Sequence, residues 1–303
     1  MSAADSLTRS PRSAAPPKVL LIGADGMLGR AFRELLARER APFRSLMFPE
    51  IDLTSDESVD RALAADMDVD VVINCAAWTD VDGAETREEE ATAVNGAGAG
   101  RLAVRCAARG ALLVHYSTDY VFNGEASSPY PVEAPLDPVN AYGRSKAVGE
   151  RLLAASGCRH LLLRTSWLYA PWAKNFVRTI AELAKKRDTL RVVEDQRGRP
   201  TSAEHLARVS WTLLGQALVG GEPHRTFHVT DGGACSWFEF ARAITDRVAP
   251  QCRVEPCLAA EFPRPARRPT YSVLDIGDTE TAVGFMSPWR DNLADVLARL
   301  ESP

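Results

Sequence analysis

The sequence predicts an α/β fold in which a doubly wound parallel sheet is joined to a smaller C-terminal lobe. Between residues 18 and 170, short apolar runs typical of buried strands alternate with longer segments typical of amphipathic helices. A glycine-rich turn follows the first run, and the later runs turn polar at their carboxyl ends. This alternation implies right-handed crossovers and a parallel sheet, whose ligands bind beyond the carboxyl ends of its strands.

Five apolar runs predict the strands of this sheet. They lie at residues 18–22, 42–48, 68–77, 111–122 and 158–169. Helix-length segments separate them. In the first of these segments the apolar side chains recur at helical spacing, at Leu28, Phe32, Leu35 and Leu36.

Helix boundaries are predicted from local signals. Thr54 and Glu57 match a capping box, so a helix should begin beside them. The long helical segment that starts near residue 87 should close at Gly110. Another helix should begin at Tyr142, after a loop that contains four prolines.

The alternation loosens after residue 169. A helix is predicted at residues 175–187 and a short strand at residues 190–195. Two further capping boxes precede helical patterns, Thr201 with Glu204 and Ser236 with Glu239. A loop rich in proline and arginine occupies residues 261–275.

Gly23, Gly26 and Gly29 form a G-x-x-G-x-x-G turn between the first strand and the first helix. Glycines here let the turn close, let the backbone approach a pyrophosphate and let helix and strand pack closely. The unpaired N–H groups of the helix amino terminus then face the phosphates. Glycine triplets also arise by chance, but this position favours a Rossmann-type dinucleotide site.

The domain organisation follows from these elements. Residues 1–17 are rich in Ser, Ala and Pro and are expected to form a disordered tail. Residues 18–170 should form the dinucleotide-binding Rossmann domain. Residues 171–303 should form mainly a substrate-binding lobe, with some segments returning to the first domain.

Composition excludes several classes of function. The 303 residues carry a net charge of −4 without a block of basic residues, so nucleic acid is not an expected partner. No apolar run reaches the roughly 18 residues that span a bilayer, and the start lacks a secretory signal. Six cysteines without a C-x-x-C pair predict reduced thiols in a cytoplasmic protein, and five histidines without ligand spacing predict no zinc site.

Tyr142 and Lys146 stand four residues apart and therefore share one face of a predicted helix. Only five of the 36 basic residues are lysines, so this lysine is unusual. The pair could be a surface contact. The chemical alternative is an acid–base tyrosine, because a nearby cation favours the phenolate and lowers the tyrosine pKa toward neutrality.

Thr118 stands at the carboxyl end of a predicted strand, where its hydroxyl could hydrogen-bond a substrate carbonyl. Hydroxyls at strand ends are common, so Thr118 alone indicates little. Together with the glycine turn, Tyr142 and Lys146, it predicts a site for hydride transfer at a carbonyl.

The motifs resemble the dTDP-4-dehydrorhamnose reductase family, within the extended short-chain dehydrogenase/reductases. The matching stretches include GADGMLG, DVVINCAAWTDVDGAE, VHYSTDYVFNG, NAYGRSKAVGE, LRTSWLYA, RVVEDQRGRPTSAEHLA and FPRPARRPTYSVLD, and they leave only the first 17 residues outside. The resemblance implies reduction of the C4 carbonyl of dTDP-4-dehydro-β-L-rhamnose to dTDP-L-rhamnose. It also allows for a homodimer.

The resemblance implies a role for each matching residue. Tyr142 would donate the proton, with Lys146 as its partner and Thr118 at the carbonyl. The coenzyme would be bordered by Gly23, Gly26, Met27, Leu28, Asp52, Leu53, Ala77, Trp78, Thr79 and Tyr116. The dTDP-sugar would be held by Thr79, Val81, Thr118, Asp119, Trp167, Asn175, Arg267 and Arg268.

Two departures from the family pattern affect the expected cofactors. Some relatives bind Mg²⁺ at a dimer interface through glutamates, one of them shortly after the third glycine, and this chain has Ala31 there. No metal is therefore expected. The end of the second strand, LMF, has no acidic residue to bind a ribose 2′-hydroxyl, which favours NADPH and leaves NADH open.

Three alternatives accompany this interpretation. Another dTDP-4-keto-6-deoxyhexose reductase would share the motifs and differ in its pocket. A non-catalytic regulatory subunit would keep the nucleotide site, although the catalytic residues are all present here. A C3/C5 epimerase would not need the tyrosine, lysine and nicotinamide set. Trp167 could likewise be a plug between the lobes instead of a wall of the sugar site.

Overall fold

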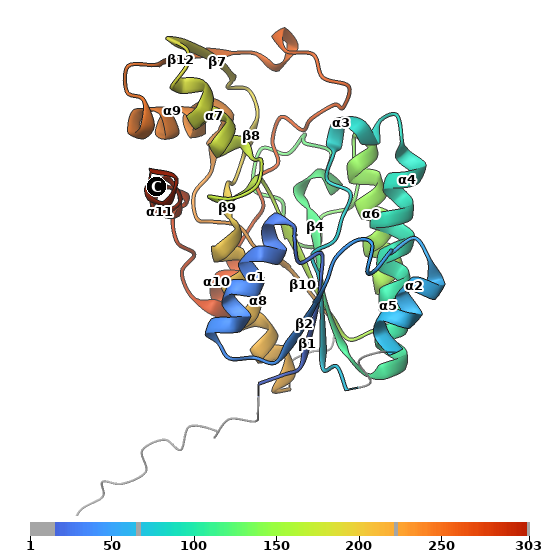
Figure 1. Cartoon of the computed structure of the whole chain (residues 1–303). Coiled ribbons are helices and arrows are strands. Elements are labelled where there is room, and N and C mark those ends of the chain that lie inside the picture. Colours follow the sequence, from blue (N-terminus) through green and yellow to red (C-terminus); the bar gives the residue numbers. More distant parts are fainter. Residues whose placement is uncertain (1–15, 65–67, 221–223, 302–303) are drawn as a thin grey trace, which may run out of the picture.

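The computed structural model describes residues 16–64, 68–220 and 224–301. Most of the expected tail, residues 1–15, lies outside the described residues. The described part contains a six-stranded sheet with the strand order β10-β5-β4-β3-β1-β2, and all of its strand pairs are parallel. Helices cover both faces, and a second lobe lies beyond the carboxyl ends of the strands (Figure 1).

Five strands of this sheet lie before residue 170, and the sixth lies after residue 220. They are β1 (Val19–Ile22), β2 (Phe43–Leu46), β3 (Val71–Asn74), β4 (Leu112–Thr118), β5 (His160–Thr165) and β10 (His224–His228). The first five lie within the predicted runs. The sixth forms the edge beside β5, so the second half of the chain completes the sheet.

The two faces of the sheet are covered by different helices. α1 (Met27–Arg38) and α8 (Ala203–Leu218) pack on one face, and α10 (Gly277–Val283) packs beside β10. α2 (Asp56–Ala64) and α5 (Ala99–Arg109) cover the other face, where α6 (Ala141–Ala155) packs against α5 and β4. Among the helices described, none has the length and apolarity needed to cross a membrane.

The second lobe has an apolar core of its own. It contains α7 (Phe176–Ala184), α9 (Trp237–Val248) and α11 (Trp289–Glu301), with the parallel pair β7 (Thr189–Val193) and β12 (Arg253–Cys257). Two short pairs join it to the first domain: β6 (Leu168–Tyr169) with β9 (Thr201–Ser202), and β8 (Arg197–Gly198) with β11 (Cys235–Ser236).

The long helix predicted near residue 87 is interrupted. The structure has α4 (Glu88–Thr92), a π-helical turn η1 (Ala93–Gly98) and then α5. The predicted end is confirmed, because Gly110 adopts a left-handed conformation with φ of 68°. Three short helices complete the chain: α3 (Val81–Ala84), η2 (Asp119–Val121) and η3 (Ala259–Glu261).

Of the three predicted capping boxes, one is confirmed and two are wrong. Ser236 and Glu239 form a reciprocal box at the start of α9. At α2 the cap is Ser55, whose hydroxyl accepts from the Ser58 backbone N–H at 3.2 Å. Thr54 instead donates its hydroxyl to Asp52. Thr201 lies in β9, one residue before the Ser202 that precedes α8.

The glycine turn is tightly packed. A Cβ atom on Gly29 would lie 2.0 Å from the Gly23 carbonyl oxygen, and one on Gly23 would lie 2.5 Å from the Ala76 nitrogen. Gly23 also has a φ of 76°, which side chains disfavour. Gly29 is therefore required by a contact within the turn, and Gly23 by its contact with the segment after β3 and by its positive φ.

A buried ion pair fixes α6 to the sheet. Arg164 of β5 donates from Nη2 to Glu150 Oε2 at 2.7 Å and from Nε to Glu150 Oε1 at 3.0 Å. It also donates from Nη1 to the Val132 carbonyl at 2.7 Å and contacts His228 of β10. The two ion-paired side chains are only 7% and 4% exposed.

We expect Gly29→Ala to destabilise the fold by about 1–3 kcal/mol, the usual cost of overpacking a rigid site. Gly215→Ala is the matched control, because no atom lies within 4 Å of the added methyl group and Gly215 is inside helix α8. It should be neutral or stabilising by up to about 1 kcal/mol. Urea unfolding measures both variants, and equal stability of the two would contradict the tight turn.

We expect Glu150→Gln to lower the free energy of unfolding by about 3–5 kcal/mol, because it leaves the Arg164 charge buried without a counter-ion. The control is Arg178→Gln, which removes an exposed pair with Glu182 at 3.7 Å. That change should stay within about 0.5 kcal/mol. Similar melting temperatures for both variants would show that water screens the Arg164 pair.

Candidate functional site

Unpaired polar atoms mark the carboxyl ends of β4 and β5. Buried side-chain atoms normally have hydrogen-bond partners. Within the described residues, Ser117 Oγ, Asp119 Oδ2 and Thr165 Oγ1 are buried and have none. Thr118 is the register partner of Thr165, so these groups lie side by side at one edge of the sheet. Their clustering indicates a place where a polar ligand completes the hydrogen bonding.

Helix α6 presents Tyr142 and Lys146 to this edge. The helix begins at Asn140, whose Oδ1 accepts from the Gly143 N–H at 2.8 Å. The Tyr142 ring lies edge-on to the Tyr120 ring, with centroids 6.2 Å apart. Gly143 permits this approach, because a Cβ atom there would lie 2.1 Å from the Tyr120 carbonyl oxygen.

The sequence predicted that Lys146 lowers the pKa of Tyr142, and the structure gives the opposite direction. Burial and then the Asp119 charge raise the pKa of Tyr142 to about 12, although a hydrogen bond with Thr118 opposes them. Burial also lowers the pKa of Lys146 to about 8, partly offset by Glu150. The same desolvation therefore acts on both groups and disfavours their charged forms.

Asp119 follows Thr118 and shares its environment. The Thr118 hydroxyl donates to Asp119 Oδ1 at 3.0 Å. Burial raises the pKa of Asp119 to about 7, and hydrogen bonds from Ser272 and Thr118 oppose the shift. In its ionised form Asp119 can accept a hydrogen bond from a hydroxyl group through the unpaired Oδ2.

The glycine turn offers a phosphate cradle. Gly26 is the N-cap of α1, no side chain caps the helix, and its first turn has no acidic residue. Met27 and Leu28 follow in that turn. The Trp172 indole donates to the Met27 carbonyl at 3.0 Å, which ties the second lobe to the cradle. An uncapped helix start beside close-packed glycines fits a pyrophosphate.

The other residues expected beside the coenzyme have varied surroundings. The Tyr116 hydroxyl donates to Ser210 at 2.9 Å, and its ring packs in the core near Phe32. Leu53 is buried against Gly98, and Asp52 accepts from both the hydroxyl and the N–H of Thr54. Ala77 and Trp78 are half-buried after β3, and Thr79 is exposed.

Some residues expected around the sugar nucleotide could contact a ligand, whereas others already use their side chains for contacts within the chain. Val81 begins α3 and is half-buried. Trp167 is half-buried and stacks on Trp237 with the ring centroids 3.5 Å apart, which is the packing expected of a plug. The Asn175 amide is used to cap α7 and to bind three carbonyls, of Ala170, Trp172 and Ala173.

Arg267 and Arg268 have different surroundings despite their adjacency. Arg268 donates to both carboxylate oxygens of Asp82, each at 3.0 Å. Burial works to lower the pKa of Arg268, but hydrogen bonds with Asp82 and Tyr120 more than offset it. Arg267 is exposed, and no described residue pairs with its guanidinium.

Sequence reasoning missed several residues that build this site. Asn95 lies in the π-helical turn, where its Oδ1 accepts from the Trp78 N–H at 2.9 Å and its Nδ2 donates to Ser145 of α6. Asp82, Glu150 and Arg164 were also missed. A π-turn has no simple sequence signal, whereas a lone Arg inside an apolar strand does signal a buried partner.

The position of Ala31 does not fit a metal ligand. Its methyl group is 3% exposed within the apolar cluster that contains Leu28, Phe32 and Leu35. Among the described residues, no group of three or more metal-ligating side chains is assembled. No step of the reaction is therefore assigned to Mg²⁺.

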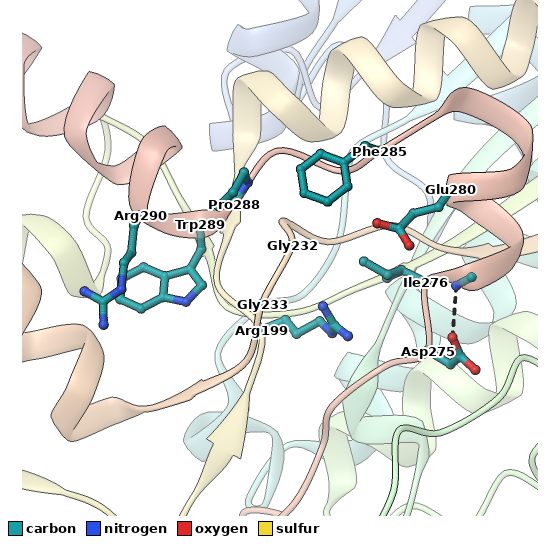
Figure 2. Close-up of a pocket in the computed structure, with 11 residues that line it drawn as sticks. Arg199, Gly232, Gly233, Asp275, Ile276, Glu280, Phe285, Pro288, Trp289 and Arg290 are labelled. Atoms are coloured by element: carbon teal, nitrogen blue, oxygen red, sulfur yellow. Dashed lines mark hydrogen bonds between the residues drawn. The ribbon is translucent and has the colours of Figure 1, made fainter.

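A separate cavity of about 490 Å³ lies between the loops that precede α10 and α11 (Figure 2). None of its lining residues belongs to the predicted site. They are Arg199, Gly232, Gly233, Asp275, Ile276, Gly277, Glu280, Phe285, Pro288, Trp289 and Arg290. Arg199 carries a buried, unpaired Nε, and two carboxylates in the same wall offset its charge.

Comparison with known proteins confirms the resemblance. The family model described as "RmlD substrate binding domain" matches residues 17–302. The chain is 40% identical over 286 residues to a dTDP-4-dehydrorhamnose reductase of Burkholderia thailandensis, covering 90% of this chain and 95% of that protein.

Solved structures agree. The crystal structure of a dTDP-4-dehydrorhamnose reductase from Clostridium acetobutylicum is 36% identical with a TM-score of 0.89, covering 94% of this chain and 100% of the other. The enzyme from Bacillus anthracis in complex with NADP is 33% identical with a TM-score of 0.86, covering 93% and 99%. The chain therefore belongs to the dTDP-4-dehydrorhamnose reductase family.

Proposed function

We propose that this protein reduces the C4 carbonyl of dTDP-4-dehydro-β-L-rhamnose to give dTDP-L-rhamnose. The observation that carries the proposal is the convergence of Tyr142, Lys146 and Thr118 beside unpaired polar atoms at the carboxyl end of β4. A phosphate cradle stands at the end of β1, which β3 separates from β4 in the sheet. Family membership supports the substrate class. The bound nicotinamide coenzyme would supply the hydride.

Residues of this chain then supply the proton to the oxygen at C4. The Thr118 hydroxyl, which donates to Asp119 Oδ1 in this structure, would turn to orient the carbonyl oxygen beside Tyr142. Because the Tyr142 pKa of about 12 keeps the phenol protonated, it can donate to the far more basic alkoxide that develops at C4. Charged Lys146 stabilises the phenolate that remains, since an opposite charge is strongly felt in a buried site.

The residues that follow β2, where the ribose of the coenzyme would bind, favour NADPH over NADH. β2 ends at Leu46, and the acidic groups that follow are already engaged. Glu50 accepts from the Met47 N–H at 3.1 Å, and Asp52 accepts twice from Thr54. A carboxylate free to select the ribose 2′-hydroxyl of NADH is not prearranged there. The relative from Bacillus anthracis was solved with NADP, which supports the same choice.

The sugar nucleotide would extend from Tyr142 toward the second lobe. Asp119 Oδ2 would accept from a hexose hydroxyl, while Thr79, Val81 and Trp167 would border the sugar. Arg267, exposed and unpaired, is the better diphosphate contact of the two arginines. Cytoplasmic location, a homodimer and independence from Mg²⁺ stay predictions.

The test of this function is to follow NADPH absorbance with the enzymatically made 4-keto sugar and to identify the product by NMR. Tyr142→Phe should lower kcat by about 10²–10⁴-fold, because it removes the proton donor and keeps the ring. Coenzyme affinity should change little. A product with the other C4 configuration would assign a different 4-keto-6-deoxyhexose reductase, and wild-type turnover by the Phe variant would remove Tyr142 from its role.

The pH dependence should follow Lys146. Its pKa of about 8 is lowered from 10.5, so its positive charge is present below pH 8 and is lost as pH rises. We expect kcat/KM to fall through this range. In Lys146→Arg the remaining activity should lose that decline, because arginine stays charged.

Asp119→Asn is the control for the pH profile, because Asp119 is a nearby group whose shifted pKa, about 7, also lies close to this pH range. The decline near pH 8 should persist in this variant. If it disappears in Asp119→Asn and remains in Lys146→Arg, the titrating group is Asp119 and the assignment to Lys146 is wrong.

A further inference from the structure

Residues 262–271, here named the strap, run from the second lobe to the loops around Tyr142 (Figure 1). Its backbone is held at separate points. The Ala266 N–H donates to Asp82 Oδ1 at 3.3 Å, and the Arg267 carbonyl accepts from Asn140 Nδ2 at 2.9 Å. Further along, the Thr270 hydroxyl donates to the Gly124 carbonyl at 3.0 Å.

Asp82 is the strongest of these attachments. Besides the hydrogen bond from the Ala266 N–H, it accepts a bidentate pair of hydrogen bonds from Arg268. Arg264 Nη1 lies 3.8 Å from its Oδ2. The Arg268 and Asp82 side chains are 22% and 26% exposed, so water screens the pair only in part. A planar guanidinium on both oxygens of one carboxylate also has a well-defined orientation.

The Arg268 contact continues toward the catalytic tyrosine. The Tyr120 hydroxyl lies close enough to Arg268 for the two side chains to shift each other's pKa, that of Arg268 upward and that of Tyr120 downward. The Tyr120 ring then meets the Tyr142 ring edge-on, with an interplanar angle of 80°. Asp82, Arg268, Tyr120 and Tyr142 therefore form one continuous chain of contacts from α3 through the strap to α6.

We propose that Asp82 and Arg268 form a staple that closes the strap over the substrate site and holds Tyr120 against Tyr142. Arg268 is thus a positioning residue, and Arg267, fixed through its carbonyl by the α6 cap, is left to meet the diphosphate. This inference rests on the proposed function only for the identity of the diphosphate ligand.

The effect of Asp82→Asn on dTDP binding distinguishes two roles of Arg268, that of a positioning residue and that of a direct diphosphate contact. If Arg268 is a staple, Asp82→Asn should weaken dTDP binding by about fivefold to tenfold, the scale of a coupled pair. Arg268→Gln should do the same, and the double variant should be no worse than either. Arg268→Lys should recover part of the affinity. If Arg268 binds the diphosphate directly, Asp82→Asn frees it, and unchanged or tighter binding would overturn the staple.

Calorimetric titration of the NADP⁺-loaded protein with dTDP measures these affinities. Arg267→Gln should weaken binding independently, so its effect should add to that of Asp82→Asn. Arg253→Gln is the control, because Arg253 is exposed and pairs only loosely with Glu255 at 3.7 Å in the second lobe. It should leave dTDP binding unchanged.

Hydrogen exchange provides a readout that needs no substrate. The Ala266 amide should exchange faster in Asp82→Asn and Arg268→Gln than in wild type, Arg267→Gln or Arg253→Gln. Unchanged protection of residues 264–272 in both staple variants would overturn the proposal. If the wild-type protein neither binds dTDP nor reduces the 4-keto sugar, the proposed function fails, while the exchange result still decides whether the staple exists.

Discussion

The arrangement of the site depends on a positive charge that has almost no access to water. Arg164 projects from β5 into the interior, and its guanidinium is satisfied by Glu150 of α6, the Val132 carbonyl and His228 of β10. A buried charge tolerates few alternative arrangements, since each lost contact leaves an unpaired polar group. The pair therefore fixes the rotation of α6 about its axis, and with it the direction of Tyr142 and Lys146.

The exclusion of water that makes Arg164 dependent on its partners also determines the pKa values of the ionisable groups at the site. Burial keeps Tyr142 protonated, brings the pKa of Lys146 down to about 8 and raises that of Asp119 to about 7. Tyr142 is thus uncharged at neutral pH, Asp119 titrates close to neutrality, and Lys146 keeps its positive charge below about pH 8. A polar substrate that pairs the orphaned atoms of β4 and β5 would then change the field that each group feels.

Much of the fold was predictable because strands and amphipathic helices leave local patterns. The five strands before residue 170, the close of the helix at Gly110 and the cap at Ser236 are visible in short windows of sequence. The pattern failed where contacts between distant residues prevailed. The sequence predicts one uninterrupted helix from residue 87 to Gly110, but η1 divides it, and Asn95 in η1 binds both Trp78 and Ser145. Strand β10 was also missed, since its short sequence HRTFH has little apolar character.

Some features of the site could likewise be predicted from the sequence, and others could not. The turn of glycines and the Tyr142–Lys146 spacing were visible, because both are fixed by neighbours in sequence. The direction of the Tyr142 pKa was not, since it depends on burial that only the packed lobes produce. Nor could sequence separate Arg267 from Arg268: the contact that distinguishes them joins residues 82 and 268, far apart in the chain.

The edge strand β10 has a consequence for biosynthesis. Its residues are translated more than fifty positions after β5, the strand with which it pairs in the described sheet. A nascent chain that has emerged as far as β5 therefore presents an open sheet edge with unpaired backbone groups. Such an edge is a site for misassociation until the later residues are synthesised. A recombinant fragment cut after the first five strands would keep that exposed edge permanently, however complete its glycine turn and catalytic helix.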